Sequence, residues 1–442
     1  KNMTKIIFMI GAGRSASSLI QYLLNEAESN DFKLIVGDKD LTLVNEKISG
    51  HKRAKAISFD VFDKQQRVEE ILKADIVISM LPANLHFKVA QDCVKYGKNL
   101  VTASYVSDEI KSLDSEAKQK GVLLLNEIGL DPGIDHMSAM KIIDSIKAKG
   151  GELTSFKSYC GGLVAPEFDT NPWSYKFTWN PRNVVLAGQG TAQYIESGKF
   201  KYIPYGQLFK RTVSLNVLDY GTFEAYANRD SLSYREIYKI DNIQTLIRGT
   251  LRRPGYGEAW NVFVQLGLTD DSFKMDVSGM TYKDFFCSFM DKTDLSIEDY
   301  LAKHFGASPT VFKKIEWLGI LNSISIDLEI ASPAEVLQKL LEVKWVLATE
   351  DKDMIVMQHQ FEYMHNGKKK ELHSSFVALG EDQVYTGMSK TVGLPVGIAA
   401  KLILNGTIAG SGVKVPVRKD IYIPVLDELE KHGIQFIEKE IQ

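Results

Sequence analysis

Six short apolar runs between residues 5 and 125 constrain the fold of this chain more than any other feature. Amphipathic stretches separate them, and the runs are Lys5–Ile10, Lys33–Val36, Lys55–Ser58, Ile76–Met80, Asn99–Ala103 and Val122–Leu125. Strands that alternate with helices pair in parallel through right-handed crossovers, and helices cover both faces of the resulting sheet. We therefore predict an α/β domain with a doubly wound parallel sheet.

A glycine-rich turn follows the first apolar run. The segment from Gly11 to Ala16 fits the G-x-G-x-x-A pattern, whose glycines let the backbone approach a pyrophosphate at a helix N-terminus. The second run ends at Asp38, where a carboxylate accepts hydrogen bonds from the adenosine ribose. These features predict a Rossmann-like dinucleotide-binding domain, with a tight turn that binds no ligand as the alternative. The expected cofactor contacts are Gly11, Gly13, Arg14, Ser15, Ala16, Asp38, Lys39, Leu81 and Pro82.

The expected cofactor is NAD or NADP. A carboxylate at Asp38 would repel the 2'-phosphate of NADP, whereas Arg14 and Lys39 could neutralise that carboxylate. The sequence therefore favours NAD mildly. The segment of Ser79, Met80, Leu81 and Pro82 ends the fourth strand, and it either lies along the nicotinamide half of the cofactor or is an ordinary loop.

Ionisable residues gather directly after the sixth run. They are Glu127, Asp131, Asp135 and His136, and the polar residue Asn126 precedes them. Ligands of open α/β sheets bind beyond the carboxyl ends of the strands, so we expect this segment to lie at the substrate site. Asp131 has an alternative role as a helix N-cap, because Pro132 would then occupy the first helical position. His136 falls within the following helix, and we expect it to be structural.

Composition limits the other possibilities. A chain of 442 residues exceeds one compact core, so two or three domains are expected, and a net charge of -3 gives no basic field for nucleic acid. Cys93, Cys160 and Cys287 are far apart and lack metal-ligand spacing, so we expect neither a disulfide framework nor a bound metal. No apolar run approaches the roughly 20 residues of a membrane span, and no signal-peptide pattern begins the chain. We expect a cytoplasmic protein without a membrane partner.

The sequence changes character after a predicted helix from about Ile134 to Ala148. Residues 282–332 look largely helical, and residues 354–364 and 371–379 alternate like antiparallel strands. Near the end, residues 396–404 form an apolar helix opened by Gly393, Leu394 and Pro395, and this helix needs a sheet to cover. A second domain therefore follows the first.

Five long motifs carry a resemblance to a known family. They are NEIGLDPGIDH at 126–136, SYCGG at 158–162, NPWSYKFTW at 171–179, IRGTLR at 247–252 and SKTVGLPVGIAAKLILNG at 389–406. Together they resemble the L-glutamate-forming saccharopine dehydrogenases, also called saccharopine reductases, along nearly the whole chain. The departures are Val164 before Ala165, and Trp173 with Ser174 where the family often has Leu-Gly.

The resemblance implies a fold and an activity. The fold is a Rossmann-like domain, residues 1–131 and 393–442, interrupted by a larger α/β substrate-binding domain, residues 132–392, with a helical insertion at about 282–332. The activity interconverts saccharopine with L-glutamate and 2-aminoadipate 6-semialdehyde in lysine metabolism, using NAD(P). The partners are then these small molecules, and a homodimer is the default assembly.

The resemblance also implies site residues, each with an ordinary alternative. Asp131, Cys160 and Tyr105 match the acid-base positions, although Cys160 has the pattern of a small buried hydrophobe and Tyr105 that of a packing residue. Ser104 and Thr269 match substrate contacts, although Thr269 could instead start a helix. Arg248 is a candidate clamp for a substrate carboxylate, with a surface salt bridge as its alternative.

Two other functions remain open from the sequence. A carboxyspermidine-type dehydrogenase has a similar architecture, but it would bind a polyamine, and Arg248 and Arg252 speak against a cationic substrate. A catalytically silent dinucleotide-binding module would not need the full set of candidate acid-base and clamp residues.

Overall fold

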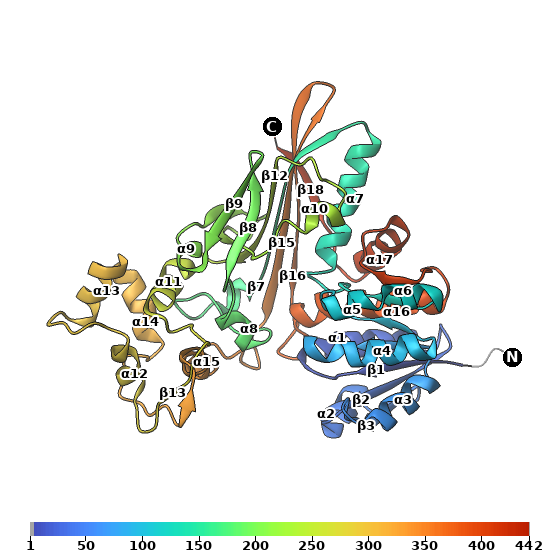
Figure 1. Ribbon diagram of the computed structural model, residues 1–442, viewed down its shortest axis with the longest axis horizontal. Coiled ribbons are helices and arrows are strands. Elements are labelled where there is room, and N and C mark those ends of the chain that lie inside the picture. The colour runs from blue at the N-terminus through green and yellow to red at the C-terminus, as the bar shows by residue number, and fades with distance from the viewer. Residues whose placement is uncertain (1–3, 442) are drawn as a thin grey trace. The chain divides into compact units, whose positions relative to one another are not determined.

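The computed structural model describes residues 4–441, which form two compact units (Figure 1). The first unit contains the described residues up to Gly150 together with Val384–Phe436, and the second contains Gly151–Gln383 and the residues from Ile437 onward. The first junction follows Gly150 rather than residue 131, because the helix after Asp131 packs within the first unit. The chain returns to the first unit at Val384 rather than at residue 393.

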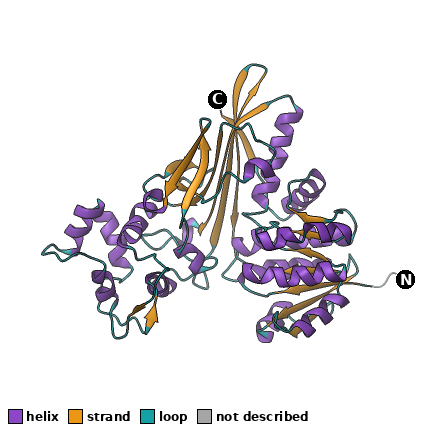
Figure 2. Cartoon of the chain, in the orientation of Figure 1, coloured by secondary structure: helices purple, strands orange, loops and turns teal. Residues whose placement is uncertain are grey.

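The first unit holds a seven-stranded parallel sheet in the order β17-β6-β5-β4-β1-β2-β3. Its strands are β1 (Lys5–Ile10), β2 (Phe32–Asp38), β3 (Ala54–Ser58), β4 (Ile76–Ser79), β5 (Asn99–Val101), β6 (Leu123–Leu125) and β17 (Gly412–Lys414). Its helices are the 3-10 turns η1 (Arg14–Ala16) and η2 (Ala83–Leu85), and α1 (Ser17–Glu26), α2 (Leu41–Ile48), α3 (Lys64–Lys73), α4 (His86–Tyr96), α5 (Asp108–Ser112), α6 (Asp114–Gln119), α7 (Ile134–Ala148), α16 (Gly387–Leu404) and α17 (Lys419–Lys431). The predicted doubly wound α/β fold is confirmed, and helices flank the sheet in Figure 2.

Local sequence explains these elements. Each of the six apolar runs overlaps one strand, and β4, β6 and residues 7–10 of β1 are buried because helices cover both sides of a parallel sheet. Asp40, Asp63 and Ser107 begin α2, α3 and α5 by accepting a hydrogen bond from a backbone N–H in the first turn. The predicted helix from Ile134 to Ala148 is α7, which packs on α17 and receives a hydrogen bond from Tyr422 Oη at Asp144, 2.6 Å long.

Helix α16 begins earlier than the sequence suggests. Thr386 caps it, Gly387 is its first residue, and Pro395 lies inside the helix instead of opening it. By length and mean hydropathy α16 could cross a membrane, but 67% of it is buried within this chain's own fold, against α1, α17 and the sheet. Close packing explains Gly393 and Gly397, because a Cβ at Gly393 would lie 2.9 Å from Leu19 Cβ and one at Gly397 would lie 2.8 Å from Tyr22 Cδ1.

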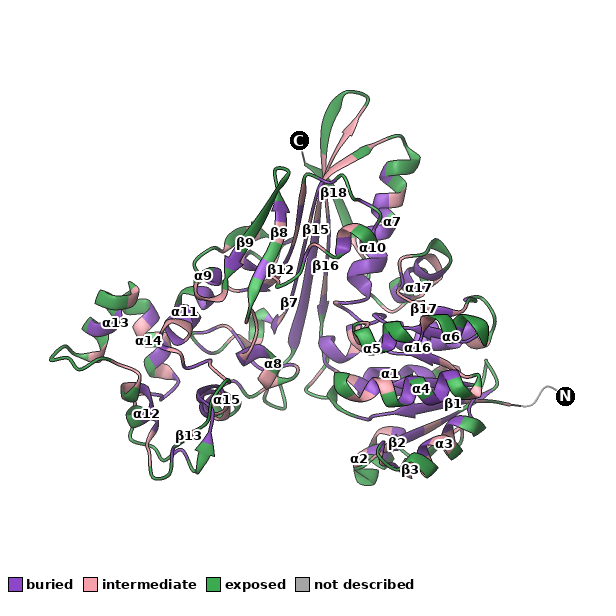
Figure 3. Cartoon of the chain, in the orientation of Figure 1, coloured by how far each residue is buried: buried purple, intermediate pink, exposed green. Residues whose placement is uncertain are grey.

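The second unit is built on a nine-stranded mixed sheet. Its main path is β10-β11-β12-β7-β15-β16-β18, with β8 beside β12 and β9 beside β8. Among the strand pairs that residues 4–441 form in this sheet, β12 and β7 run parallel and the others antiparallel. The strands are β7 (Glu152–Val164), β8 (Thr191–Glu196), β9 (Lys199–Pro204), β10 (Val213–Asn216), β11 (Thr222–Ala227), β12 (Thr245–Arg252), β15 (Asp353–His365), β16 (Lys368–Leu379) and β18 (Ile437–Ile441). The predicted antiparallel pair at 354–364 and 371–379 is β15 with β16, and Figure 3 shows much of β7 and β15 as buried.

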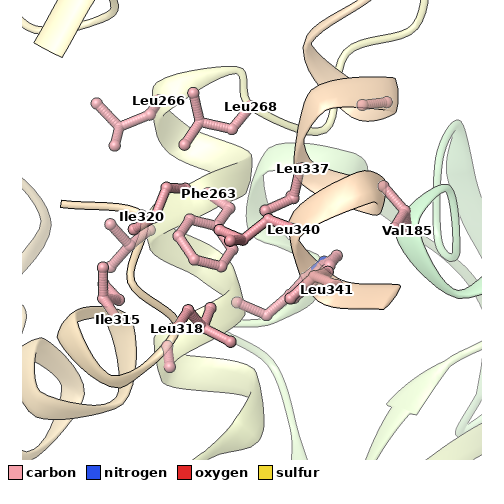
Figure 4. Packing of buried hydrophobic residues seen from close by; sticks show 14 of the residues in the cluster. Val185, Phe263, Leu266, Leu268, Ile315, Leu318, Ile320, Leu337, Leu340 and Leu341 are labelled. Atoms are coloured by element: carbon pink, nitrogen blue, oxygen red, sulfur yellow. The ribbon is translucent and has the colours of Figure 1, made fainter. Parts of the chain in front are cut away.

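A helical part accompanies this sheet. Its elements are η3 (Pro166–Phe168), α8 (Pro181–Val185), α9 (Tyr205–Leu208), α10 (Tyr234–Ile237), α11 (Tyr256–Leu266), α12 (Tyr282–Ser288), α13 (Ile297–Phe305), α14 (Pro309–Trp317), α15 (Pro333–Lys344) and the small ladder of β13 (Met275–Asp276) with β14 (Ile330–Ala331). Figure 4 shows Phe263, Leu318 and Leu341 meeting in its core. The stretch 282–332 is therefore largely helical, as predicted, and packs around α11.

We predict that Gly393→Ala destabilises the protein, because the added methyl group would press on Leu19 and on the Ser15 carbonyl at 3.1 Å. Overpacking of this kind costs about 1–3 kcal/mol of unfolding free energy. Urea unfolding measures it, with Lys390→Ala on the same helix as the control, for which a change within about 0.5 kcal/mol is expected. Equal stability of the two variants would contradict the close α1–α16 contact.

Candidate active site

The glycine-rich turn after β1 leaves space for a ligand. Gly11 has φ of 100° and its N–H donates to the Gly37 carbonyl, while a Cβ at Gly11 would lie 2.7 Å from the Met80 oxygen. At Gly13, by contrast, an added Cβ would meet no atom within 4 Å. The backbone of the turn thus packs closely against Met80 at Gly11, whereas open space adjoins Gly13. An open glycine at the start of η1 and α1 fits the pyrophosphate of a dinucleotide.

Asp38 shapes this turn through both carboxylate oxygens. Its Oδ2 accepts a hydrogen bond of 2.7 Å from Ala12 N–H, and its Oδ1 accepts one of 3.0 Å from Asp40 N–H. The sequence assigned Asp38 only to the ribose, so its structural work was missed. Lys39 lies 3.5 Å from Asp60 in an exposed ion pair. Arg14 is exposed in η1.

Lys47 is a basic residue at the turn that sequence reasoning missed. From the last turn of α2 it donates a hydrogen bond of 2.7 Å to the Gly13 carbonyl. Burial lowers the pKa of Lys47 to about 8, and the Asp38 carboxylate partly opposes this shift. The local sequence around Lys47 does not predict its hydrogen bond to Gly13, because the two residues are 34 positions apart.

Glu127 holds the loop that carries Ser104 and Tyr105. Its Oε1 accepts a hydrogen bond of 3.0 Å from Val106 N–H, and its backbone N–H donates to the Ser104 carbonyl, also at 3.0 Å. Its Oε2 lies 2.7 Å from His136 Nε2 in α7, where both side chains are buried. The residue adopts a positive φ of 56° to make these contacts. His136 therefore acts as a structural partner of Glu127, in line with the expectation.

A second histidine joins the ends of two strands. His86 Nδ1 lies 2.8 Å from Ser79 Oγ at the end of β4, and His86 Nε2 lies 2.6 Å from Ser104 Oγ after β5. Burial lowers the pKa of His86 to about 4. Sequence reasoning missed His86, and it considered Ser79 only as part of the segment that ends the fourth apolar run.

Asp131 does not cap the following helix. Helix α7 begins at Ile134 with Gly133 as its N-cap, so the alternative with Pro132 at the first helical position is wrong. Gly133 has φ of 146° and lies so close to Gly129 that no Cβ would fit, and its N–H donates to Asp135 Oδ1 at 2.6 Å. Asp131 is half-buried at the carboxyl edge of the first unit.

Other predicted side chains of the first unit differ in exposure. Tyr105 is 52% exposed after β5, which argues against a packing role. After β4, Leu81 is partly exposed and Pro82 is exposed. Asn126 is buried after β6, and among residues 4–441 neither polar atom of its side chain has a hydrogen-bond partner. A buried amide of this kind is costly unless a ligand or water satisfies it.

Three predicted site residues belong to the second unit. Cys160 is a buried residue of β7, opposite Thr250 of β12 and Met357 of β15. Arg248 in β12 is only 4% exposed and stacks on Tyr234, 3.8 Å from the ring centre, so it is not a surface arginine.

Thr269 is buried, and its Oγ1 accepts a hydrogen bond of 2.9 Å from Tyr205 Oη. No helix begins at Thr269, because α11 ends at Leu266 and α12 begins at Tyr282. The helix-start alternative for Thr269 is therefore wrong.

Arg252 is a further basic residue that the sequence did not single out for the site. Its guanidinium is 4% exposed and lies 4.9–5.9 Å from the ring centres of Tyr175, Tyr226 and Tyr256. It donates to the Leu251 carbonyl, but its Nε has no partner and no carboxylate pairs with it among the described residues. Burial raises the pKa values of Tyr175 and Tyr256, so these phenols stay neutral and do not balance the charge.

The structure thus gathers the predicted residues into two sets. The carboxyl edge of the first unit carries the glycine-rich turn, Ser104, Tyr105 and Asp131, and the second unit carries Cys160, Arg248 and Thr269. The first set has the features of a dinucleotide site beside ionisable side chains. Arg248 of the second set and the nearby strand residue Arg252 are buried cations suited to an anionic ligand.

Comparisons with known proteins match both units. The profile of the saccharopine dehydrogenase NADP binding domain matches residues 7–125, and that of the saccharopine dehydrogenase C-terminal domain matches residues 129–434. The chain is therefore built on an NAD(P)-binding domain. In solved structures of low identity, a homospermidine synthase from Legionella pneumophila shares the fold, with 10% identity and a TM-score of 0.55.

Relatives of similar length match nearly end to end. The saccharopine dehydrogenase [NADP(+), L-glutamate-forming] of Schizosaccharomyces pombe is 33% identical over 98% of this chain and 98% of its own length, and that of Saccharomyces cerevisiae is 33% identical over 99% and 100%. An apo structure of the Saccharomyces cerevisiae enzyme covers 99% of this chain and all of its own, with 31% identity and a TM-score of 0.90.

The chain also matches longer proteins. It is 34% identical to the mitochondrial alpha-aminoadipic semialdehyde synthase of Mus musculus over 98% of this chain, but it spans only 47% of that protein. Both domain profiles occur in order, and the match to the fungal enzymes extends over the whole of their length. The chain belongs to the saccharopine dehydrogenase family.

Proposed function

We propose that this chain interconverts saccharopine with L-glutamate and 2-aminoadipate 6-semialdehyde. In the oxidative direction saccharopine and water yield the two amino acids, while NAD(P)+ gains a hydride and one proton is released. The full-length match to the two fungal L-glutamate-forming enzymes carries this proposal. The open glycine-rich turn and the buried cations of the second unit support it.

The substrate's charge accounts for the arginines. Saccharopine has three carboxylates, each of which must exchange water for a cation or a hydrogen-bond donor. Arg252 is a buried cation without a protein carboxylate, so a substrate carboxylate would supply the missing opposite charge. We assign a second clamp to Arg248, whose stacking on Tyr234 fixes its guanidinium. The same buried cations would repel a polyamine, which disfavours a carboxyspermidine-type reaction.

Proton transfer would involve Asp131, Tyr105 and Cys160. The secondary amine must lose a proton before its carbon gives up hydride, and the resulting imine must then gain water. Asp131 is the best base among them, because it is half-buried at the edge where the parallel strands end. Tyr105 is exposed beside Ser104, and Cys160 lies opposite Thr250 in the second unit. Thr269 and Ser104 would donate hydroxyl groups to the substrate.

The cofactor would lie on the first unit. When bound, the nicotinamide ring accepts or returns the hydride. Gly11, Gly13, Ser15 and Ala16 would hold the pyrophosphate, and the unsatisfied amide of Asn126 offers a donor and an acceptor near the end of β6. The family profile and the fungal relatives are named for NADP, so the mild preference for NAD has no support from the comparisons. We propose that both cofactors bind.

Two further expectations stay predictions. A cytoplasmic location is consistent with the sequence, but the matched mouse protein is named as mitochondrial. A homodimer is the default assembly, and small molecules rather than nucleic acid or membrane are the proposed partners.

Initial rates with saccharopine test the proposed activity directly. We expect reduced-nicotinamide absorbance to rise with NAD, NADP or both, and glutamate to appear in equal amount. A protein that binds a dinucleotide but turns over no saccharopine with either cofactor would contradict the proposal, and a silent binding module would then be the better description.

Replacing Arg252 should weaken substrate binding. We expect Arg252→Met to raise the saccharopine KM roughly tenfold to hundredfold, since a hydrogen bond to a charged group contributes about 1.5–3 kcal/mol. Arg253→Met removes the same charge from a neighbour that donates to the Tyr220 carbonyl, and it should leave KM unchanged. Equal KM values for the two variants would remove Arg252 from the substrate site.

Cofactor affinity should depend on pH through Lys47. A bound pyrophosphate favours the ammonium form, and the pKa of Lys47 in the free protein is about 8, so affinity should fall as pH rises above 8. Fluorescence titration of NADH and NADPH on both sides of pH 8 measures this. Lys47→Arg, which stays charged, should flatten the dependence, whereas Lys52→Met at an exposed ion pair should preserve it. If the cofactor affinity of Lys47→Arg fell with pH as it does in the wild type, Lys47 would not be the group that causes the pH dependence.

A further inference from the structure

Three polar side chains form a continuous hydrogen-bonded row at the carboxyl edge of the parallel sheet. Ser79 is the last residue of β4, His86 is the first residue of α4, and Ser104 follows β5. The two links are 2.8 Å from Ser79 Oγ to His86 Nδ1 and 2.6 Å from His86 Nε2 to Ser104 Oγ. The row runs from a fully buried serine to a half-buried one.

His86 is neutral near pH 7. Burial lowers its pKa to about 4, and its place in the first turn of α4 opposes a positive charge because the helix dipole is positive there. A neutral imidazole has one protonated nitrogen that donates and one bare nitrogen that accepts. The row therefore has only two arrangements, which differ in which ring nitrogen carries the hydrogen.

Ser79 selects between these arrangements. Its side chain is 0% exposed, and within residues 4–441 the hydroxyl has no hydrogen-bond partner other than His86 Nδ1. If Nδ1 carried the hydrogen, the Ser79 hydroxyl would be left as a buried donor without an acceptor, which proteins avoid. Ser79 therefore donates to Nδ1, and the imidazole hydrogen resides on Nε2.

The Nε2–H tautomer determines the direction in which the Ser104 hydroxyl can donate its hydrogen. Nε2–H donates to Ser104 Oγ, so the hydroxyl hydrogen of Ser104 cannot point back at His86 and is available to a ligand. The backbone of Ser104 is held as well, because its carbonyl accepts from Glu127 N–H. A fixed hydroxyl donor suits a carboxylate oxygen, which only accepts.

We propose that Ser79 and His86 are positioning residues that commit the Ser104 hydroxyl to donating a hydrogen bond to a substrate carboxylate. The identity of that substrate rests on the proposed function. The tautomer and the availability of the hydroxyl do not depend on it, so they are tested separately.

Nitrogen-15 NMR of histidine-labelled protein tests the tautomer without any substrate. The His86 signals are assigned by their loss in His86→Gln. In the wild type we expect the neutral form with hydrogen on Nε2. In Ser79→Ala the preference for that form should weaken, because Nδ1 loses its hydrogen-bond donor and an Nδ1–H would have no acceptor. A wild-type His86 protonated on Nδ1, or identical tautomer populations in the two proteins, would overturn the inference.

Kinetics with saccharopine test the consequence. Ser104→Ala should raise KM about tenfold, the effect of losing one hydrogen bond to a charged group, with little change in kcat or in cofactor affinity. Ser79→Ala should raise KM by less, because it only weakens the commitment of the Ser104 hydroxyl, and the double variant should match Ser104→Ala alone, because both changes act on one donor. Additive effects, or a Ser79→Ala variant with wild-type KM, would overturn the inference.

Controls separate positioning from stability and from the proposed activity. Cys93→Ala alters a buried side chain of the same helix outside the row, so it should lower thermal stability while leaving KM unchanged. If Ser79→Ala does not fold, Ser79→Cys keeps the shape with a weak donor and should still raise KM. A wild type that binds cofactor but does not turn over saccharopine contradicts the proposed function, and the NMR result then decides the inference alone.

Discussion

The carboxylate of Glu127 joins three segments on which the first unit's site depends. One oxygen binds the N–H after Tyr105, the other pairs with His136 in α7, and the Glu127 backbone holds the Ser104 carbonyl. A buried carboxylate is tolerated only when hydrogen bonds satisfy it, so these contacts have to form together. The loop after β5, the loop after β6 and the start of α7 are thereby fixed to one another. Asp131 lies within the segment that this arrangement holds.

The charged residues around the glycine-rich turn also hold backbone segments in place. Asp38 binds two backbone N–H groups and Lys47 binds the Gly13 carbonyl, so both charges shape the turn. An assignment of cofactor preference from Asp38 alone therefore overlooks its structural work. The second unit differs, because Arg252 lies among neutral aromatic rings and is not compensated by a carboxylate among the described residues. That arrangement leaves the cation available to an anionic ligand.

The sequence predicted the elements better than the contacts. Apolar runs mark β1 to β6 and the pair β15–β16, because burial on both faces or alternation leaves a direct trace in residue type. The order of the strands, and the return of residues 387–414 to the first sheet, depend on packing between distant segments. Long motifs led to the predictions for Asp131 and Arg248. Lys47 and His86 were missed, and the contact of Ser79 and the aromatic surroundings of Arg252 were not predicted, since these features depend on partners far away in the sequence. The start of α16 was predicted too late in the sequence, because a proline usually marks the first turn of a helix and Pro395 lies inside this one.

The return of the chain has a consequence for how the protein is made. Strand β17 pairs with β6, and α16 packs on α1, so residues 412–414 and 387–404 complete a domain whose other strands lie before residue 126. During synthesis on the ribosome, the first unit cannot be completed until more than half of the chain has followed β6. Until then the edge of β6 is unpaired and one apolar face of α1 is uncovered. Exposed edges and apolar faces invite chaperones and aggregation during such a delay. The late helix thus couples the folding of the cofactor-binding domain to the synthesis of the domain inserted within it.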